Sequence, residues 1–374
     1  MPAVSVVMPV YNTRDYVARA IESVLGQTFG DFELLIVDNG STDGSGAIID
    51  RFAAQDARIR VLRNEKNVLI AQARNSALDE ARGEYLCLVD SDDWVLPDML
   101  EVMVGRARRF DAQYVVAGYY MDYCIRGRNV SYAVCPDDRD YGQREFRENA
   151  VRYLVHTLLT VPWNKLYSMA YLRAQGIRFR DTKLEDHHFN MDILMDVERV
   201  SMVERPLYYY YRSRPGTDSE LVYNQCLNQK KRDHIAHTLA VYAHWGIGDE
   251  RTLGMLADYH MGRLVQCVAQ TVANHQLDRE EKRRQLREIV NDRYTAFAVR
   301  YALNRSKRIA LLSVPIRMKS VGLCTLMGWT VGAFKHACAP AYYAMRASVA
   351  QGARRAEQRD ADEDSDSIDR GDVL

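Results

Sequence analysis

Three aspartates lie within four positions at the end of an apolar run, in the segment LCLVDSDDWVLPD at residues 86–98. Neighbouring carboxylates repel one another, and one unit of pKa shift corresponds to about 1.4 kcal/mol. A divalent cation offsets this repulsion, because Mg²⁺ or Mn²⁺ binds carboxylates and completes its shell with water and substrate phosphates. Asp90 and Asp92 point to the same side of an extended segment, so we predict that they share such a ligand. Asp93 then faces elsewhere or caps the following turn.

A structural interpretation of the same residues is that they end a strand and cap the helix that begins near Pro97. Two further polar groups favour the alternative, a site that binds a ligand or carries out catalysis. In IVDNGSTDGS, Asp38 is followed by small residues that can wrap a ligand closely and then open a helix. In NVLIAQARNSAL, Arg74 lies among small residues on a predicted helix. Taken singly, such a turn is more often structural, and a single arginine is usually a surface charge.

The elements that must position these groups alternate between β-branched runs and amphipathic stretches over the first 120 residues. Strands are predicted at residues 4–10, 32–38, 59–63, 84–90 and 112–120, and helices at 16–25, 44–54 and 70–81 and from residue 97. This pattern is typical of an α/β protein with a mostly parallel, Rossmann-like sheet and helices on both faces. Ligands of such sheets bind beyond the carboxyl ends of the strands. PVYN, DNGSTD and DSDD follow the first, second and fourth strands, so these polar groups should converge on one edge.

The rest of the chain has a weaker pattern. Residues 145–220 mix short helices with strand-like pieces such as VSMVERPLYYYYR, and residues 225–291 are helical with charged, solvated faces. From 304 to 355 basic residues surround apolar patches, and the uninterrupted apolar run at 320–334 has 15 residues. A membrane-spanning helix needs ~20, so this run is too short. The last 18 residues, 357–374, hold eight acids and two arginines, and we expect them to be disordered.

Composition narrows the classes of function. Lys plus Arg equals Asp plus Glu, at 50 each, so no overall basic field favours nucleic acid as a partner. The seven cysteines are odd in number, scattered and never in CxxC spacing, which argues against a disulfide framework or a zinc site. We interpret them as reduced cytoplasmic thiols. The N-terminus, MPAVSVVMPVYN, enters a β-branched run at once, which favours a first strand over a signal peptide.

A family resemblance rests on two segments, SVVMPVYNTRDYVARAIESVLGQTFGDFELLIVDNGSTDGS and NEKNVLIAQARNSALDEARGEYLCLVDSDDWVLPDML. Together they resemble the family 2 glycosyltransferases of the GT-A fold, inverting enzymes that build bacterial polysaccharides. The likeness is dense over residues 4–125 and continues more loosely to about residue 215 through PWNKLY, LEDHHF and YYYYR. It implies transfer of a sugar from a nucleotide-diphosphate donor, most often a UDP-sugar, to a hydroxyl of a cell-surface glycan or lipid-linked acceptor. It also implies Mg²⁺ or Mn²⁺ as a Lewis acid for the departing diphosphate.

The resemblance assigns roles to individual residues. Asp92 is implied to be the principal metal ligand, and Asp90 to meet the metal or the ribose. Asp38 is implied to meet the uracil or an equivalent base, and Arg74 to approach the nucleotide. The other implied substrate contacts are Pro9, Val10 and Tyr11, which line the nucleotide pocket, together with Ser91 and Glu185.

The chain departs from the family pattern at two positions. Asn39 stands where the family usually has a second aspartate, and Leu69 stands where it usually has glycine. Neither departure removes a carboxylate that is assigned a role. Leu69 changes the backbone path that is expected near Arg74.

Direct displacement at the anomeric carbon needs a base for the acceptor hydroxyl, on the face opposite the leaving diphosphate. KLEDHHFNMDIL offers Glu185 and Asp186 and resembles the family's ED element, in which the aspartate is the usual base, so we predict Asp186. Adjacent acids discourage each other's ionisation, which raises the proton affinity of the base. The alternative is an exposed acidic turn at a helix start. His187 and His188 are metal ligands or supporting groups or, as we favour, ordinary polar residues of that helix.

Three other features are open to a functional and a structural interpretation. Arg212 and Arg214 could close over the diphosphate or stay solvated. Trp163 could stack on an acceptor sugar, or lie in the core with Lys165 pairing an acid. The basic and apolar region 304–340 could attach to an anionic membrane surface, or pack on its own domain or on a second subunit of a homodimer.

We therefore expect four parts: a nucleotide-sugar-binding part of the GT-A domain at 1–125, its acceptor-binding part at 126–220, a mainly helical region at 221–355, and an acidic tail at 356–374. The expected location is the cytoplasm or the inner face of the plasma membrane. Two rival functions remain. One is a non-catalytic member of the same fold that binds sugar nucleotides or acts as a scaffold. The other is a haloacid-dehalogenase-type phosphatase, which requires Thr or Val where this chain has Trp94.

Overall fold

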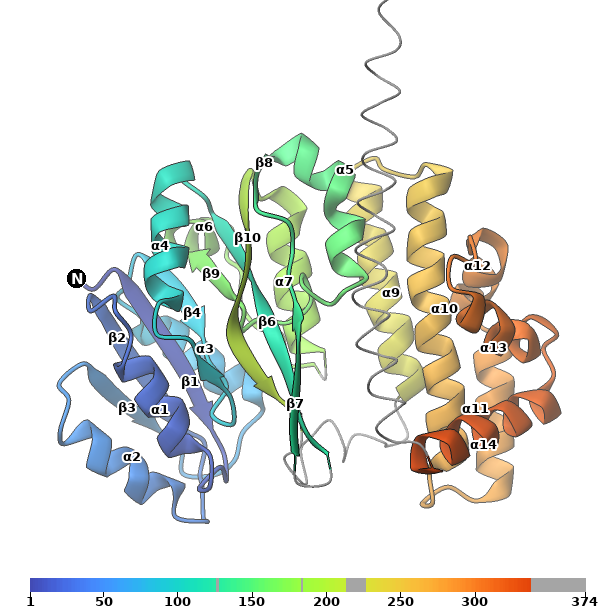
Figure 1. Ribbon diagram of the computed structural model, residues 1–374, viewed down its shortest axis with the longest axis horizontal. Coiled ribbons are helices and arrows are strands. Elements are labelled where there is room, and N and C mark those ends of the chain that lie inside the picture. Colours follow the sequence, from blue (N-terminus) through green and yellow to red (C-terminus); the bar gives the residue numbers. More distant parts are fainter. Residues whose placement is uncertain (126–127, 183, 213–226, 338–374) are drawn as a thin grey trace, which may run out of the picture.

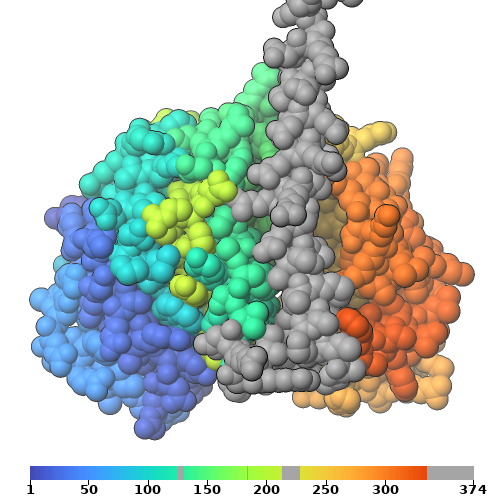
Figure 2. Space-filling view, viewed as in Figure 1, coloured from blue at the N-terminus to red at the C-terminus, as the bar shows by residue number. Residues whose placement is uncertain are grey.

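The computed structural model describes residues 1–125, 128–182, 184–212 and 227–337 (Figure 1). A ten-stranded sheet with its helices forms one end of the molecule, and the helices that follow residue 227 form the other. The space-filling view shows the same division, with the blue N-terminal residues and the orange residues of the helical region at opposite ends (Figure 2).

Four parallel strands form the part of the sheet with the clearest sequence signal. They are β1 (Val4–Val10), β2 (Phe32–Asp38), β3 (Ile59–Arg63) and β4 (Tyr85–Leu88), in the order β3-β2-β1-β4. Both β1 and β2 are buried along their whole length, as expected for apolar strands covered on both faces. The helices between these strands are α1 (Val17–Leu25), α2 (Ser45–Ala53) and α3 (Ile70–Glu80). Their bounds confirm the predicted helices to within one residue.

Six further strands extend the sheet, and most are antiparallel to a neighbour. β9 (Lys165–Ser168) lies between β4 and β6 (Tyr114–Ile125), antiparallel to both, and β10 (Arg199–Tyr211) runs parallel to β6. The remaining strands are β5 (Trp94–Val95), β7 (Arg128–Val134) and β8 (Arg139–Gly142). The predicted α/β class is confirmed, with a mixed second half that the sequence pattern did not indicate. β6 extends past its predicted end because it pairs with β7.

The register of the parallel strands brings their carboxyl ends together. Val10 of β1 pairs with Asp38 of β2, and Asn39 N donates a hydrogen bond to Val10 O at 2.8 Å. On the other side of β1, Val89 N donates to Val7 O at 3.0 Å. The segments that follow β1, β2 and β4 therefore share one edge of the sheet, as predicted.

Four helices complete the sheet-bearing part: α4 (Met99–Phe110), α5 (Gln143–Leu154), α6 (Met169–Ala174) and α7 (Glu185–Asp196). The helix predicted from Pro97 begins at Met99, and it packs against β6 and β10. Helix α7 opens with the two acids of LEDHHF, so the predicted base lies in the first turn of a helix.

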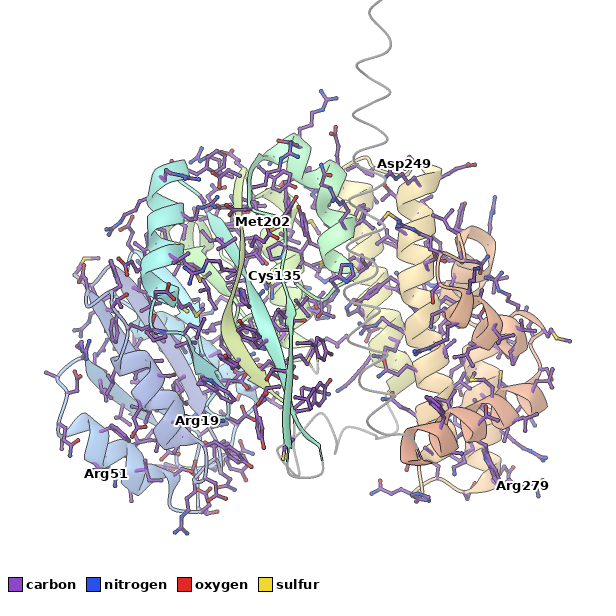
Figure 3. The ribbon with its side chains drawn as sticks, viewed as in Figure 1. Arg19, Arg51, Cys135, Met202, Asp249 and Arg279 are labelled. Atoms are coloured by element: carbon purple, nitrogen blue, oxygen red, sulfur yellow. The ribbon has the colours of Figure 1, made fainter. Side chains whose placement is uncertain are left out.

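The helical region is confirmed and is built around α10 (Glu250–Ala273), which contacts each of its neighbours. These are α9 (Leu227–His244), α11 (Arg279–Asn291), α12 (Arg293–Tyr301), α13 (Lys307–Arg317) and α14 (Val321–Ala337). The side chain of Asp249 caps α10 by accepting a hydrogen bond from Thr252 N at 2.9 Å. Figure 3 shows Asp249 at one end of this helical region and Arg279 at the other. The acidic tail at 357–374 lies outside the described residues.

Candidate active site

The aspartates that follow β4 lie in a turn. Asp93 N donates a hydrogen bond to Asp90 O at 3.1 Å, which is the bond that closes a β-turn. The segment is therefore not extended, and the strand alternation that we used to place Asp90 and Asp92 on one side does not apply. Ser91 is buried inside the turn, whereas Asp90 and Asp92 are partly exposed. The turn presents these two carboxylates at the edge where ligands of such sheets bind.

Asp93 is held by β10 and does not cap a helix. The Tyr208 hydroxyl donates to Asp93 Oδ2 at 2.6 Å, and Tyr211 N donates to Asp93 Oδ1 at 2.8 Å. The same Tyr208 oxygen accepts a hydrogen bond from Asp90 N at 3.1 Å. Burial, together with Asp92 and Asp90, raises the pKa of Asp93 well above its ordinary value. The hydrogen bonds of Asp93 and Tyr208 thus fix the turn to β10. Tyr208 is a residue that the sequence analysis did not identify.

Arg74 lies buried at the centre of a cluster of three partly exposed carboxylates. It is 1% exposed, and its guanidinium forms ion pairs with Asp90 at 3.2 Å, with Glu185 at 3.7 Å and, more closely, with Asp186. Burial opposes its charge, but the attraction of Asp186, Asp90 and Glu185 outweighs burial and raises the pKa of Arg74. Arg74 is therefore not the surface charge that a single arginine usually is, because three acids from two distant segments compensate it inside the protein. We call these four residues the Arg74 cluster.

The acids of the Arg74 cluster differ in their pKa and in their exposure. Burial raises the pKa of Asp90 to about 6; Arg74 opposes the shift, and Asp92 and Asp186 add to it. Burial and the neighbouring Asp186 raise the pKa of Glu185 to about 7, again against the effect of Arg74. The Asp186 side chain is 36% exposed, more than twice the 15% of Glu185. Of the two predicted acids on α7, Asp186 is therefore the one that solvent and a substrate hydroxyl can reach.

Asn190 anchors the start of α7 to the sheet. Its amide nitrogen donates to Asp186 O at 2.8 Å, and its oxygen accepts hydrogen bonds from the hydroxyls of Tyr114 at 2.8 Å and Tyr167 at 3.1 Å. All three side chains are buried. The sequence analysis missed this anchor, although an asparagine one helical turn after the acids is its signal. The backbone of Asp186 is thereby positioned by β6 and β9.

Asp38 and Asn39 form the second polar group of the edge. Asp38 accepts hydrogen bonds from Ser41 N at 3.0 Å and from Arg63 Nη1 at 3.1 Å. The Asn39 amide nitrogen donates to Asn67 Oδ1 and to Val68 O, both at 2.8 Å, while its oxygen accepts from Val68 N at 3.1 Å. An aspartate could not make the two donations, which gives the departure from the family pattern a structural reason.

Gly40 and Leu69 complete the path of this loop. Gly40 has φ of +77°, and a Cβ there would lie 2.7 Å from the carbonyl carbon of Lys66, so only glycine fits. Leu69 precedes α3 in an extended conformation and is exposed, and the helix still begins at Ile70, as predicted. The second departure therefore leaves the backbone that carries Arg74 intact.

The remaining predicted nucleotide contacts differ in exposure. Pro9 and Val10 are buried inside β1, whereas Tyr11, the next residue, is exposed where the strand ends. The structure thus presents the side chain of Tyr11, and not those of Pro9 and Val10, on the surface of the edge.

The PWNKLY segment belongs to the core. The Trp163 ring is buried and stacks on Tyr208 with 4.4 Å between ring centroids. Among the described residues no acid forms an ion pair with Lys165, which corrects our expectation; its ammonium donates to Leu158 O at 2.7 Å and Asn164 Oδ1 at 2.6 Å, and also to Val161 O. Burial lowers the pKa of Lys165 well below its ordinary value. This segment therefore supports Tyr208 and, through it, the aspartate turn.

The two histidines after Asp186 join α7 to α9. The His187 ring is buried and stacks on His234 with 3.6 Å between centroids, and His188 Nδ1 lies 2.7 Å from His237 Nδ1. Burial lowers the pKa of His187 well below its ordinary value. These contacts support a structural role. Arg212 donates to the Tyr210 hydroxyl at 2.6 Å, whereas Arg214 lies outside the described residues.

The donor set at the turn suits a hard divalent cation. Within the described ranges, no three His, Cys, Asp or Glu side chains converge as a complete metal cage. Mg²⁺ and Mn²⁺ do not need one, because water and substrate phosphates complete their shells. The partly exposed carboxylates of Asp90 and Asp92 fit that mode of binding.

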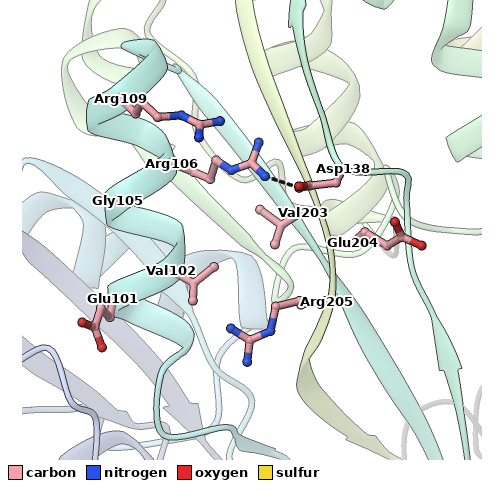
Figure 4. A pocket seen from close by; sticks show the side chains of 9 residues that line it. All are labelled: Glu101, Val102, Gly105, Arg106, Arg109, Asp138, Val203, Glu204 and Arg205. Atoms are coloured by element: carbon pink, nitrogen blue, oxygen red, sulfur yellow. Dashed lines mark hydrogen bonds and ion pairs between the residues drawn. The ribbon is translucent and has the colours of Figure 1, made fainter.

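A hollow of about 450 Å³ lies elsewhere, between α4 and β10 (Figure 4). Three arginines line it, but Arg106 pairs with Asp138, Arg109 with Asp140 and Arg205 with Asp98. None of the residues predicted to take part in chemistry contributes to its wall. The candidate site is therefore the edge with the aspartate turn and not this hollow.

The chain is similar in sequence to known glycosyltransferases. The model of the family described as "Glycosyl transferase family 2" matches residues 5–173. Glycosyltransferase GlyG of Streptococcus pneumoniae is 44% identical over 229 residues, which cover 57% of this chain and 72% of GlyG. The uncharacterized glycosyltransferase EpsJ of Bacillus subtilis is 29% identical over 249 residues, covering 66% of this chain and 72% of EpsJ.

Solved structures share the fold. The crystal structure of S. aureus TarS 1-349 in complex with UDP-GlcNAc has a TM-score of 0.62 and 20% identity, covering 88% of this chain and 91% of that one. The mannosyltransferase PcManGT of Pyrobaculum calidifontis, in complex with GDP-Man and Mn²⁺, has a TM-score of 0.50 and 16% identity, with coverage of 88% and 86%. At these identities the likeness concerns the fold.

Proposed function

Because the chain belongs to glycosyl transferase family 2 and is a glycosyltransferase, we propose that it moves one sugar, with inversion, from a UDP-sugar to a hydroxyl of a cell-surface glycan or lipid-linked acceptor. Family membership removes the phosphatase alternative. The observation that carries the finer proposal is the Arg74 cluster, which connects an acid of the aspartate turn with an acid at the start of α7.

The donor side of the proposed site is the sheet edge. Asp90 and Asp92 would hold Mg²⁺ or Mn²⁺, which supplies a Lewis acid for the departing diphosphate. Asp38, fixed by Arg63, and the exposed ring of Tyr11 would contact the nucleotide. The UDP-GlcNAc complex of TarS supports a UDP-sugar as donor, and the Mn²⁺ in the mannosyltransferase complex supports the metal.

The acceptor side is the start of α7. Asp186 would take the proton of the attacking hydroxyl as the new bond forms at the anomeric carbon. Arg74 orients its carboxylate, and Asn190 fixes its backbone. Glu185 is the more buried of the two acids, with a pKa raised to about 7, so it is protonated in a large share of molecules near neutrality. Glu185 therefore shapes the charge around Asp186 and is not the proposed base.

We propose that the predicted parts of the chain have different roles in binding and catalysis. Residues 1–125 would bind the nucleotide sugar and residues 126–220 the acceptor. The two share one continuous sheet, since β9 and β10 of the second part pair with β4 and β6 of the first. Arg74 and Asp186 come from different parts, so the catalytic arrangement requires both. Within the predicted part at 221–355, α9 contacts α7 and so supports the helix that carries Asp186.

Ligand-induced thermal stabilisation tests the donor half of the proposal. A ligand at ~100 times its Kd adds about 2.7 kcal/mol to the free energy of unfolding. We expect UDP-sugars with Mn²⁺ to raise Tm, and neither GDP-sugars nor UDP-sugars with EDTA to do so to the same extent. Stabilisation by GDP-sugars alone would reject the proposed UDP donor.

Turnover tests the catalytic half and the rival role as a non-catalytic binding protein. The donor that stabilises the protein is supplied with lipid-linked and free glycan acceptors, and release of UDP and the anomeric configuration of the product are measured. Release with inverted configuration is the expected result. Binding of donor without transfer to any acceptor would favour the non-catalytic role, and a retained configuration would reject inversion.

A further inference from the structure

The outer face of α14 is apolar although it is exposed. Leu326 is 62% exposed and Trp329 67%, and Leu323 and Phe334 are also exposed. Leu323, Leu326 and Trp329 recur every three residues, and Phe334 lies about three turns after Leu323, so the four share one side of the helix. The opposite face is buried: Cys324, Met327 and Gly328 face α10, where a Cβ on Gly328 would lie 2.6 Å from a methyl of Val272. Packing among the residues that the structure describes therefore does not account for the outer stripe.

The preceding helix carries a similar stripe. Leu311 is 73% exposed and Met318 63%, and Val314 between them is also exposed. Lys307 lies one turn before Leu311 on the same face of α13. Helices α13 and α14 pack against each other at the end of the molecule opposite β2 and β3 (Figure 1). We call the exposed side chains of these two helices the α13–α14 patch.

The charged residues of the chain segment that carries the α13–α14 patch have a single sign. The sequence from Arg293 to Ala356 contains no aspartate or glutamate. Lys307, Arg308 and Lys319 are exposed, and within the part of the chain that the structure describes no carboxylate forms an ion pair with them. An exposed apolar stripe flanked by the cations of its own two helices is complementary to a surface that offers both hydrocarbon and negative charge.

We propose that the α13–α14 patch is a docking surface for an anionic lipid membrane, on which both helices lie flat. Leu311, Met318, Leu326 and Trp329 enter the interface between headgroups and acyl chains, where tryptophan is favoured, while the lysines and arginines meet lipid phosphates. The helices lie on the bilayer and do not cross it. α14 has 17 residues, a length of about 26 Å, short of the ~30 Å hydrocarbon core. Among the described helices, none is long and apolar enough to span a membrane.

Two other occupants fit less well. In a two-fold dimer through this patch, the cations of one copy would approach those of the other, because a self-complementary interface repeats each charge. The acidic tail, residues 357–374, complements the charge but offers few apolar side chains to cover the stripe. A membrane surface satisfies both requirements, and it does so whether or not the proposed transfer reaction is correct.

Vesicle co-sedimentation of the full chain, without nucleotide sugar, tests the proposal. The vesicles are phosphatidylcholine alone or an equal mixture of phosphatidylcholine and phosphatidylglycerol. We expect binding to the mixture that weakens as salt is raised, with little binding to phosphatidylcholine alone. The emission of Trp329 should shift to shorter wavelength on binding, and Trp329→Phe should lose that shift and keep the binding.

Matched variants locate the surface. Leu326→Ser with Trp329→Ser should lower the partition coefficient about tenfold or more, and Lys307→Glu with Arg308→Glu should do the same. The controls are Val130→Ser, an exposed apolar residue of β7, and Arg283→Glu with Arg287→Glu, exposed cations of α11. Both controls should bind as the parent does. An unchanged thermal midpoint shows that each variant is folded.

Three results would overturn the proposal. The first is equal binding of the patch variants and the parent. The second is a dimer in sedimentation velocity that Leu326→Ser with Trp329→Ser dissociates, which would assign the patch to a second copy of the chain. The third is binding that appears only after residues 357–374 are deleted, which would assign the patch to the tail.

Discussion

The guanidinium of Arg74 donates a hydrogen bond to the carboxylate of Asp186, although 112 positions separate the two residues in the sequence. Arg74 comes from α3, beside the parallel strands, and Asp186 from the first turn of α7. The same guanidinium contacts Asp90 of the aspartate turn at 3.2 Å. One buried cation therefore fixes the relative position of the proposed metal-binding turn and the proposed base.

Replacing the proposed base should abolish transfer without abolishing donor binding. Asp186→Asn keeps the shape of the side chain but cannot accept the acceptor proton, so kcat should fall by about 10²–10⁴-fold. The thermal shift produced by the donor and Mn²⁺ should persist. Glu148→Gln, which neutralises an exposed acid of α5, is the control and should keep full activity. Unchanged kcat in Asp186→Asn would show that the base is another group.

Removing the cation of the Arg74 cluster should destabilise the protein. Arg74→Met leaves the three acids of the cluster without their buried cation, and breaking a buried ion pair costs about 3–5 kcal/mol. We expect that loss in the free energy of urea-induced unfolding. The exposed Arg144 pairs with Glu148, so Arg144→Met serves as the control and should cost less than about 1 kcal/mol.

A double-mutant cycle separates the ion pair from simple loss of packing. Adding Asp186→Asn to Arg74→Met removes one of the unpaired charges, so the double variant should lose less than the sum of the two single losses. Strictly additive losses would mean that Arg74 and Asp186 do not interact in solution.

The hydroxyl of Tyr208 should matter for the aspartate turn. Tyr208→Phe leaves Asp93 Oδ2 and Asp90 N without their shared partner, and an unsatisfied buried group costs about 1–3 kcal/mol. Both the free energy of unfolding and the Mn²⁺-dependent activity should decrease. Tyr209→Phe is the matched change on the neighbouring, partly exposed residue and should have little effect. Equal effects of the two variants would count against the role given to Tyr208.

The buried acid Glu185 should make stability depend on pH. Burial raises its pKa to about 7 in the folded state, above the ordinary ~4.3 of the unfolded chain. Its contribution to stability is therefore fully present below about pH 4 and is lost as pH rises through about 7. Glu185→Gln stays neutral, so its Tm should fall less than that of the parent between about pH 5 and 8. A parallel fall in the two proteins would contradict the raised pKa, and Glu148→Gln controls for loss of a surface acid.

Replacing Asn39 by aspartate, the usual family residue at this position, should destabilise the protein. Asn39→Asp cannot donate to Asn67 Oδ1 and Val68 O, and it places a carboxylate against both oxygens. The free energy of unfolding should fall by about 1–3 kcal/mol. A variant as stable as the parent would show that the loop at residues 64–68 rearranges to accept the charge.

The sequence by itself determined the first half of the fold and the edge of the sheet at which the candidate site lies. Apolar runs and helical periodicity are local properties, so the bounds of β1, β2 and α1 could be predicted closely. The polar segments after the strands also followed, because parallel strands end on one edge. The pair Glu185 and Asp186 was identified only through resemblance, since an acidic helix start alone has several structural explanations.

Tertiary structure alone decided which of these polar groups act together. The burial of Arg74 depends on acids far away in the chain, and Lys165 donates to backbone and amide oxygens where the sequence suggested an acid. Tyr208 carries no local signal that distinguishes it from a core residue, and the only local signal of Asn190 is its place one helical turn after the acids. A charge or hydroxyl is stabilised by whatever surrounds it in space, and sequence periodicity records only which face of an element is buried. Local pattern therefore predicts strands, helices and edges, whereas the partners of buried polar groups require the fold.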